Sequence, residues 1–409
     1  MAFIIQFLYT YNQLTKIWDI KKEISPSPKK RVKKCSVCRF VVTSQKKRFV
    51  RLFRTFECLP CKSSHSMLQY DFMKEEKPFI PFVSVIIPCR NEEKFIESCL
   101  NSIIGQSYPK DKLEVLVVDG MSEDKTREII ARIHEKHEYI KLLENPKKFT
   151  PFAFNIGVKH SKGEFIIIMG AHASYDHNYI RGCIDNATKY NADNTGGVAL
   201  ATPKNNTITA NAIVHVLSCK LGTGGAKFRK SFKKPTYADT VFGGCYSRNV
   251  FEKIGLFNES LHRSQDIEFN IRLKKAGGKI LLVPDIICHY YPKSTLREFL
   301  KHEFKEGFWI IYASKFTKIK FKLRHYIPLI FTSTLIATGI GSLLNEFALY
   351  AFMGILIPYA TTLLITSTLA SIKEKNMNYI AILPMAFIIR HIIYGFGSIW
   401  GVLKMPFNS

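Results

Sequence analysis

The last fifth of this 409-residue chain is the part that most restricts its fold, because residues 326–403 are almost continuously apolar. Tyr326–Leu344 and Phe347–Leu369 are each long enough to span a bilayer, with Asn345 and Glu346 as a tight turn between them. Tyr379–Leu403 is a third candidate. The sequence therefore predicts a membrane domain of about three helices over residues 326–403. The alternative is a buried helical bundle in a soluble protein.

A basic amphipathic stretch, residues 294–324, precedes this domain and is expected to lie along a membrane surface. Its cations follow one another closely towards its end, at Lys315, Lys318, Lys320 and Lys322. Together with Lys373 and Lys375 after the second apolar segment, they predict that both loops face the cytosol. We therefore expect a multi-pass protein of the cell membrane whose other domains are cytoplasmic.

The net charge of +26 has two physical explanations. Nucleic-acid binding would produce it, but a membrane protein that faces anionic lipid has the same balance. Residues 1–79 hold 17 Lys/Arg against 6 Asp/Glu and so contribute +11 of the total. Residues 1–34 form a basic N-terminal segment, and nothing in residues 82–310 favours nucleic acid, so no such partner is expected.

Residues 82–172 alternate between short β-branched runs and segments with helical spacing. The runs that predict strands are Val83–Ile87, Val115–Val118, Ile140–Leu143 and Phe165–Met169. Continuous apolar strands separated by helices predict an α/β domain whose sheet is covered on both faces. Ligands of such sheets bind beyond the carboxyl ends of the strands, where Pro88–Glu92, Asp119 and Gly170–His172 would lie.

Four stretches, residues 83–93, 117–126, 163–172 and 242–289, together resemble the inverting family-2 glycosyltransferases. The likeness is greatest to exopolysaccharide-type enzymes with a C-terminal membrane anchor. It implies a GT-A fold over residues 82–293, a Rossmann-like mixed sheet with mostly parallel strands. It also implies a nucleotide-sugar donor and a lipid-linked or growing glycan acceptor.

The resemblance places nucleotide-sugar binding at the strand ends and on one following helix. The implied residues are Pro88, Arg90, Asn91, Glu92, Asp119, Asn155, Gly157 and Ala171. Asp119 corresponds to the family aspartate that accepts a hydrogen bond from uracil, so a UDP-sugar is expected; a carboxylate can only accept, which suits an imide N–H. The alternative is that Asp119 is a turn residue. Arg90 stands where an aromatic residue is common and would stack on the base or meet a phosphate.

Gly170-Ala171-His172 stands where the family has Asp-x-Asp, whose outer aspartate usually binds Mn²⁺ or Mg²⁺. Gly170 has no side chain to donate, whereas imidazole is an acceptable ligand for Mn²⁺. His172 and His289, which matches a C-terminal histidine ligand of many relatives, are therefore the expected metal ligands. The alternative is a loop histidine at position 172 and an enzyme that needs no metal.

Phe242-Gly243-Gly244-Cys245 resembles the glycine loop where the acceptor approaches the donor. Gln265-Asp266 corresponds to the family's Glu-Asp pair, and Asp266 would be the general base that takes the proton from the acceptor hydroxyl. A helix N-cap is the alternative role for Asp266.

Two features bear on turnover. Glu306-Gly307-Phe308-Trp309 lacks the arginine of the Gln-x-x-Arg-Trp motif of processive synthases, which implies transfer of a single sugar. The missing carboxylate at Gly170 leaves open a degenerate member that binds nucleotide sugar, or a partner enzyme, without catalysis.

Arg390 and His391 interrupt the third apolar segment, and Arg390 has no acidic partner inside any of the three segments. A charge at that depth is expected to face protein or an anionic group. We hypothesise contact with the phosphate of a polyprenyl-linked acceptor; the alternative is a shallow segment from which Arg390 reaches the interface.

Cys35 and Cys38, with Cys58 and Cys61, form two Cys-x-x-Cys pairs that enclose 19 residues. This spacing predicts a zinc-ribbon-like unit over residues 35–66 that holds one structural Zn²⁺. Free thiols or a redox pair are the alternatives. The other six of the ten cysteines are scattered, several of them in apolar runs, which is typical of buried thiols in a reducing compartment.

Overall fold

The structure is a computed structural model, and it describes residues 80–224, 232–317 and 321–405. The basic segment and the zinc-ribbon-like unit predicted over residues 1–66, with Cys35, Cys38, Cys58 and Cys61, lie outside the described residues. Five of the six remaining cysteines are buried.

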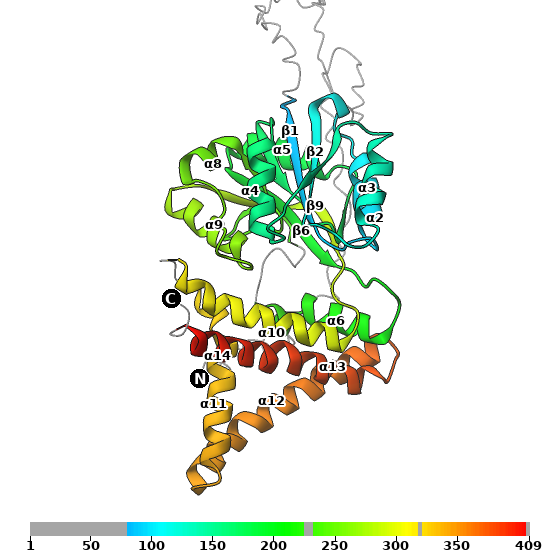
Figure 1. Cartoon of the computed structure of the whole chain (residues 1–409). Helices are drawn as coiled ribbons and strands as arrows, with labels where there is room; N and C mark the ends of the chain where they lie inside the picture. Colours follow the sequence, from blue (N-terminus) through cyan, green and yellow to red (C-terminus); the bar gives the residue numbers. More distant parts are fainter. Residues whose placement is uncertain (1–79, 225–231, 318–320, 406–409) are drawn as a thin grey trace, which may run out of the picture. The chain divides into compact units, whose positions relative to one another are not determined.

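One mixed sheet forms the centre of the domain that begins at Val83 (Figure 1). Its strands are β1 (Val83–Cys89), β2 (Leu113–Asp119), β3 (Ile140–Glu144), β4 (Phe165–Ile168), β5 (Ala173–Tyr175), β6 (Asn194–Ala201), β7 (Thr236–Tyr237), β8 (Cys245–Ser247) and β9 (Ile280–Tyr290). The order in space is β3-β2-β1-β4-β8-β6-β9-β5, with β7 paired to β9. The first four are parallel, as predicted, whereas β8 runs antiparallel to β4 and β6.

Helices cover both faces of the sheet because its strands are apolar on both. They are α2 (Ile96–Ile104), α3 (Thr126–His134), α4 (Thr150–His160), α5 (Tyr179–Tyr190), α8 (Arg248–Ile254) and α9 (Gln265–Lys275). Two further helices between β6 and β7, α6 (Ile208–Ser218) and α7 (Lys220–Thr223), pack instead against the helices that follow the sheet. Val85 and Ile87 of β1 pack in one core with α2, α3 and α5, while Ile86 packs in the other with α4, α8 and α9. This alternation is the period of two expected of a strand.

Beyond the sheet the chain is helical. The helices are α10 (Leu296–Tyr312), α11 (Ile327–Gly341), α12 (Glu346–Lys373), α13 (Tyr379–Ile388) and α14 (Tyr394–Lys404), and a π-helical turn, Ile389–Ile393, joins α13 to α14. Glu346–Lys373 and Tyr379–Lys404 are each long and apolar enough to cross a membrane. The helix in the first predicted span, α11, has 15 residues and is shorter than expected.

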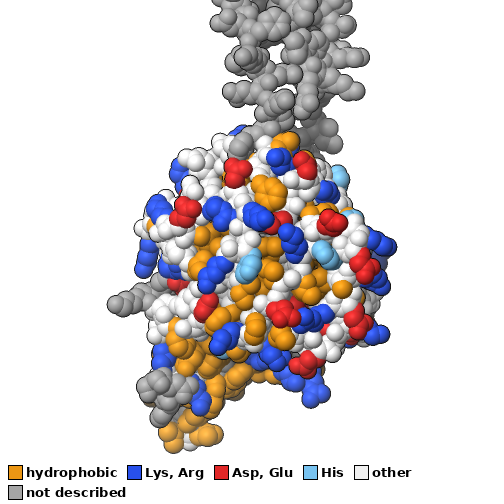
Figure 2. All heavy atoms as spheres, turned by 45° about the horizontal axis from the view of Figure 1, so that its top comes forward, with side chains coloured by type: hydrophobic (Ala, Val, Ile, Leu, Met, Phe, Trp, Pro, Cys, Tyr) orange, Lys and Arg blue, Asp and Glu red, His pale blue; other side chains and the backbone are white. Residues whose placement is uncertain are grey.

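The α11–α12 hairpin carries the most exposed apolar side chains. Leu343, Leu344 and Phe347 at its tip are 84%, 81% and 86% exposed. Figure 2 shows hydrophobic side chains gathered at the lower end of the view, where Figure 1 has this hairpin, and charges of both signs mixed over the rest of the face. An apolar surface of this kind needs lipid or protein to cover it.

Glycines bring α14 into backbone contact with α10. A Cβ on Gly307 of α10 would lie 1.9 Å from the Tyr394 carbonyl oxygen, and one on Gly397 of α14 would lie 2.1 Å from that of Phe304. Ser398 Oγ donates to the Gly307 carbonyl at 3.0 Å. Small residues with a hydroxyl hydrogen bond between them are a usual way for apolar helices to pack closely.

Arg390 has an acidic partner, which lies outside the three apolar segments, as the sequence premise allows. Its guanidinium forms an ion pair with Glu303 of α10, whose side chain is only 1% exposed, and its Nε donates to the Gly222 carbonyl at 2.8 Å. Burial acts to raise the pKa of Glu303, but the charges and hydrogen bonds of Arg390 and His302 together outweigh burial, so that the pKa is lowered. The charge is therefore neutralised within the protein, and no external phosphate is needed to explain it.

The glycine packing predicts opposite effects of one substitution at two sites. Gly397→Ala should lower the free energy of unfolding by about 1–3 kcal/mol, because the added methyl group meets backbone that cannot move away. Gly354→Ala in α12 should raise it by roughly 0.5–1 kcal/mol, because alanine is the better helix former and a Cβ there has nothing within 4 Å. Denaturant unfolding of both variants in one detergent measures the difference; equal effects would contradict close packing at Gly397.

Candidate functional site

Three of the predicted motifs meet at one edge of the sheet, because β1, β2 and β4 are parallel neighbours. Cys89, the last residue of β1, lies opposite Asp119, the last residue of β2. β4 pairs with β1 on its other side and ends at Ile168, two residues before Gly170. The carboxyl ends of parallel strands are where ligands of such sheets bind.

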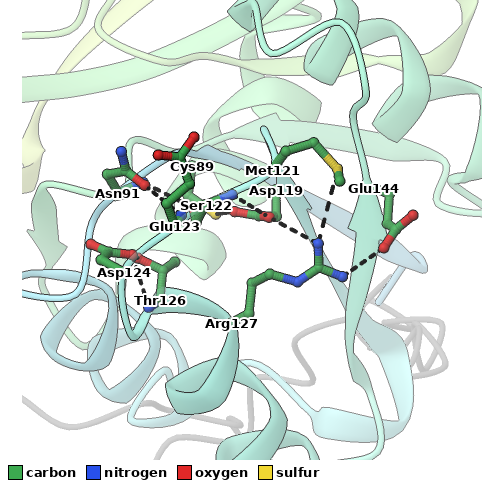
Figure 3. Close-up of polar contacts among 10 residues, drawn as sticks. All are labelled: Cys89, Asn91, Asp119, Met121, Ser122, Glu123, Asp124, Thr126, Arg127 and Glu144. Atoms are coloured by element: carbon green, nitrogen blue, oxygen red, sulfur yellow. Dashed lines mark hydrogen bonds and ion pairs between the residues drawn. The ribbon is translucent and has the colours of Figure 1, made fainter.

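Asp119 is completely buried, and its carboxylate organises the turn that follows β2 (Figure 3). It accepts hydrogen bonds from the backbone N–H of Ser122 at 3.0 Å and from Ser122 Oγ at 2.5 Å. The Cys89 thiol lies 3.7 Å from the same carboxylate, and burial raises the pKa of that thiol well above its usual value. Asp119 therefore has the turn role considered as its alternative, and its uracil contact stays a prediction.

Arg127, which the sequence reasoning missed, neutralises two carboxylates. Asp119 and Glu144 are in register at the ends of β2 and β3. Arg127 lies 3.6 Å from Asp119 and 2.6 Å from Glu144 (Figure 3). Two carboxylates at the ends of adjacent parallel strands repel each other unless a cation lies nearby. The acidic residues at these two strand ends were therefore the sequence signal that could have pointed to Arg127.

The loop after β1 is bound to the turn after β2. Asn91, which has a left-handed φ of 54°, accepts from the N–H of Glu123 at 2.9 Å (Figure 3), and its own N–H donates to Ser122 Oγ at 2.9 Å. The N–H of Glu92 donates to Thr126 Oγ1 at 2.8 Å. The Arg90 side chain is 41% exposed and reaches to 3.8 Å from Glu123, so its guanidinium stands at the surface of the site.

Two other predicted nucleotide-binding residues have packing roles. The Asn155 side chain is 3% exposed and exchanges two hydrogen bonds of 2.9 Å with the backbone of Phe257. A Cβ on Gly157 would lie 2.4 Å from Ile86, so this glycine lets α4 pack on β1. Their nucleotide contacts stay predictions, while the visible function of both is to hold α4 in place.

The segment after β4 places His172 beside the loop after β1. His172 Nδ1 lies 3.5 Å from Glu92 Oε1. Ala171, which stands between Gly170 and His172 in the chain, is buried in the core. Gly170 is not required by its surroundings, since the nearest atom to a Cβ there would be Phe242 Cζ at 4.0 Å. A carboxylate side chain would therefore fit at position 170.

His289 has different partners from His172. Its Nε2 lies 3.3 Å from Asp176 and its Nδ1 lies 3.2 Å from Thr202 Oγ1. His289 pairs with Ser174 across β5 and β9, and the Tyr291 N–H donates to the His172 carbonyl, so the two histidines occupy diagonal positions. In residues 80–224, 232–317 and 321–405, no three His, Cys, Asp or Glu side chains form a metal-binding group. Joint metal ligation by the two histidines remains a prediction.

The glycine loop lies directly against the end of β4. Gly243 and Gly244 have φ values of 66° and 117°, which favour glycine. A Cβ on Gly243 would lie 2.3 Å from the Ile168 carbonyl oxygen, and the Ile168 N–H donates to the Gly244 carbonyl at 2.9 Å. This predicted acceptor loop thus adjoins the segment Gly170–His172.

Asp266 is the second residue of α9 and lies on the helix face that meets the glycine loop. Asn270, one turn further along, donates to Thr240 at 3.0 Å, and the Tyr246 hydroxyl lies 3.5 Å from both Asn270 and the Gly243 carbonyl. Burial, and after it the negative charge of Asp266, raises the pKa of the Tyr246 hydroxyl. The helix is preceded by Ser264, whose φ of 62° is rare for a residue with a side chain. The structure therefore brings Asp266 to the loop where the acceptor is expected.

The surroundings of Asp266 differ from those of an ordinary surface carboxylate. Burial raises the pKa of Asp266; the N–H of Ile267 opposes this, and the negative charge of Glu306 raises the pKa further. Glu306 belongs to α10 and forms an ion pair with Arg263, three residues before Asp266. Raised carboxylate pKa values are common where a side chain transfers protons.

Gln265, beside Asp266, has a buried side-chain oxygen with no hydrogen-bond partner among the described residues. A buried unpaired acceptor costs free energy unless something donates to it. A substrate hydroxyl is one group that would do so.

Comparison with known proteins agrees with this architecture. Residues 84–255 match the sequence family described as glycosyl transferase family 2. The chain is 31% identical over 334 residues to the dolichyl N-acetyl-alpha-D-glucosaminyl phosphate 3-beta-D-2,3-diacetamido-2,3-dideoxy-beta-D-glucuronosyltransferase of Methanococcus voltae, which covers 79% of this chain and 98% of that protein. It is 30% identical over 230 residues to glycosyltransferase AglE of Haloferax volcanii, with 56% and 72% covered.

Among solved structures, mannosyltransferase PcManGT from Pyrobaculum calidifontis, in complex with GDP-Man and Mn²⁺, has a TM-score of 0.50 and 20% sequence identity. The match covers 79% of this chain and 88% of that one. This likeness confirms the predicted GT-A fold with its mixed sheet. The sheet, the site at its carboxyl edge and the sequence relatives lead to one conclusion: the chain belongs to glycosyltransferase family 2 and is a glycosyltransferase.

Proposed function

We propose that this protein is an inverting glycosyltransferase that moves one sugar from a UDP-linked donor to a lipid-linked acceptor at a membrane. Asp266 acts as the general base, and the glycine loop Phe242–Cys245 receives the acceptor. The observation that carries the proposal is the position of Asp266, a half-buried carboxylate with a raised pKa on the helix face that meets the glycine loop. Inversion needs one base opposite the leaving nucleotide, and Asp266 would supply it.

The acceptor class rests on the relatives and on the apolar helices. The Methanococcus voltae relative is named for action on a dolichyl phosphate-linked N-acetylglucosamine. An acceptor of this chemistry has its first sugar at the level of the lipid headgroups. Two helices of the described chain are long and apolar enough to lie in a membrane. A polyprenyl-phosphate-linked sugar is therefore the acceptor that we propose.

A divalent metal would be held by two protein groups. The His172 imidazole and the Glu92 carboxylate, 3.5 Å apart, offer one nitrogen and one oxygen donor beside the expected diphosphate, a pair that suits Mn²⁺. The ion would offset the charge of the departing nucleoside diphosphate. Proton transfer depends on Asp266, while the buried oxygen of Gln265 would accept a hydrogen bond from a neighbouring hydroxyl of the acceptor sugar and so orient that sugar.

A second function is favoured by Gly170. A family member without a carboxylate at this position would bind nucleotide sugar, or a partner enzyme, without turnover. One measurement distinguishes the two functions, because only the catalytic one predicts product formation that depends on Asp266.

Asp266→Asn should leave donor binding intact and lower turnover by at least about 10²-fold, because the amide cannot accept the proton of the acceptor hydroxyl. Binding of UDP by calorimetry and transfer of labelled sugar to membranes that contain the acceptor measure the two effects. A wild type with no transfer from any UDP-sugar would favour the non-catalytic function. A variant with near wild-type rates would remove Asp266 as base.

Glu306→Gln provides a control on the same assignment through pH. The base must be deprotonated to act, and Glu306 raises the pKa of Asp266. Removal of that negative charge should lower the pKa, so that the acid limb of the turnover profile moves to lower pH. A limb that stays in place or moves to higher pH would show that another group is titrating.

Asp119→Asn tests the uracil contact without a change of shape. An amide nitrogen donates where the carboxylate accepted, so UDP should bind about 1–3 kcal/mol more weakly. Cytosine has an acceptor at the corresponding ring position, so the preference for UDP over CDP should shrink or reverse. Equal weakening of both nucleotides, with a lower melting temperature, would indicate that Asp119 acts only through its turn.

Gly170→Asp tests whether the segment Gly170–His172 holds the diphosphate. The structure has room for the side chain, and a carboxylate there should lower the Mn²⁺ concentration needed for half-maximal UDP binding. Gly170→Asn, of equal size and without charge, is the matched control and should not do so. Identical Mn²⁺ dependence in all three proteins would place the metal elsewhere.

A further inference from the structure

We propose that Tyr379–Lys404, although long enough to span a bilayer, lies flat in the membrane interface along α10 and presents an aromatic and basic face to lipid headgroups. The membrane-inserted part would then be the α11–α12 hairpin alone. Four observations carry this inference, and each concerns what the segment touches along its length.

The middle of the segment is polar and is held by groups outside it. Arg390 is paired with Glu303 of α10, and its Nε donates to the Gly222 carbonyl of α7 at 2.8 Å. His391 Nε2 lies 3.0 Å from the Leu221 carbonyl. Leu221 and Gly222 belong to α7, which lies between strands β6 and β7 of the catalytic sheet in the chain, and not to a membrane helix. A spanning helix would place its middle in hydrocarbon, whereas this one rests on protein.

The second half of the segment, α14, packs with its backbone against that of α10, a helix that carries charged side chains. Gly397 and Gly401 of α14 lie against the backbone carbonyls of Phe304 and Phe308 in α10. The two helices therefore run side by side in the same direction, so both must lie at the same depth in a membrane. On its exposed side α10 carries Arg297, Glu298, Lys301 and Lys305. Each such charge is costly at the centre of a bilayer. Since α10 cannot enter hydrocarbon, α14 stays at the surface with it.

Lysine side chains lie near both ends of the segment Tyr379–Lys404. Its end is tied to the segment before the hairpin, where Lys315 Nζ donates to the Met405 carbonyl at 3.1 Å. Its start follows Lys373 and Lys375 at the end of α12. The charge of Lys373 also reaches His215 of α6, the helix against which α13 packs. Cations on both sides of a hairpin mark one face of the membrane, so the segment begins and ends on that face.

The exposed side of α14 has the composition of an interfacial helix. Phe396, Trp400 and Leu403 are 42%, 47% and 53% exposed and recur at helical spacing. Trp400 lines a shallow hollow with Phe304, Lys305 and Phe308, and the Lys404 ammonium lies 5.3 Å from the centre of its ring. Tryptophan and lysine together are enriched where headgroups meet acyl chains. This face continues onto the exposed apolar surface of the hairpin, so a bilayer surface with anionic headgroups is the partner it fits.

Epitope tags at three places in the full-length protein test the inference. One is inserted at Lys136 in the exposed turn after α3 of the catalytic domain, one between Lys375 and Asn376, and one after Ser409. Antibody binding is measured on sealed membrane vesicles of both orientations. We expect all three tags to bind in the same vesicles, whichever face the catalytic domain occupies.

Two results would overturn the inference. A tag after Ser409 that binds only in the opposite vesicles would show that Tyr379–Lys404 crosses the membrane once after the hairpin. A tag at Asn376 that binds only in the opposite vesicles would show that the α11–α12 hairpin does not return the chain to its starting face. If the tag after Ser409 then binds together with the one at Lys136, Tyr379–Lys404 crosses back. Neither reading depends on transferase activity, so the test is independent of the catalytic proposal.

Discussion

Two glutamates one turn apart on α10 join the parts of this protein. Glu303 is buried and neutralises Arg390 in the apolar segment, whereas Glu306 pairs with Arg263, just before the candidate base Asp266. His302 lies 3.2 Å from Glu303 and 3.7 Å from Glu306. Removal of one partner from a buried ion pair strands the other charge, so these contacts define where the helices sit more than how stable they are. The helix that rests on the apolar segment is thus the helix that sets the electrostatic surroundings of Asp266.

This connection gives a physical reason for the choice of acceptor. His262 and Trp309 have ring centres 5.0 Å apart, which adds an aromatic contact between α10 and the residues before α9. If α10 lies at the headgroup level, Asp266 is held close to that level as well. A sugar attached to a lipid phosphate would reach the base without leaving the membrane surface, whereas a soluble glycan would gain nothing from this arrangement.

Buried polar contacts, instead of the family's usual pair of aspartates, hold the strand ends where the nucleotide sugar is expected to bind. Asp119 accepts two hydrogen bonds from Ser122 and lies near the Arg127 cation, so the turn after β2 is held in place before any nucleotide arrives. Rigid positioning of donors and charges lowers the cost of binding. At the segment after β4 the carboxylate is absent, although the space for it remains, and Glu92 on the neighbouring loop brings a carboxylate to His172.

The sequence alone determined the order of elements and the motifs at the strand ends, because strand runs and helical spacing are local properties. It also located Asp266 and the glycine loop through resemblance. Only the tertiary structure decided the partners: Glu303 and Arg390 are 87 positions apart, and Asp119 and Glu144 meet because β2 and β3 are in register. The same holds for Asn155 and Gly157, whose packing on Phe257 and Ile86 arises from the way α4 crosses the sheet. Such pairings depend on how helices and strands pack, which composition and spacing do not specify.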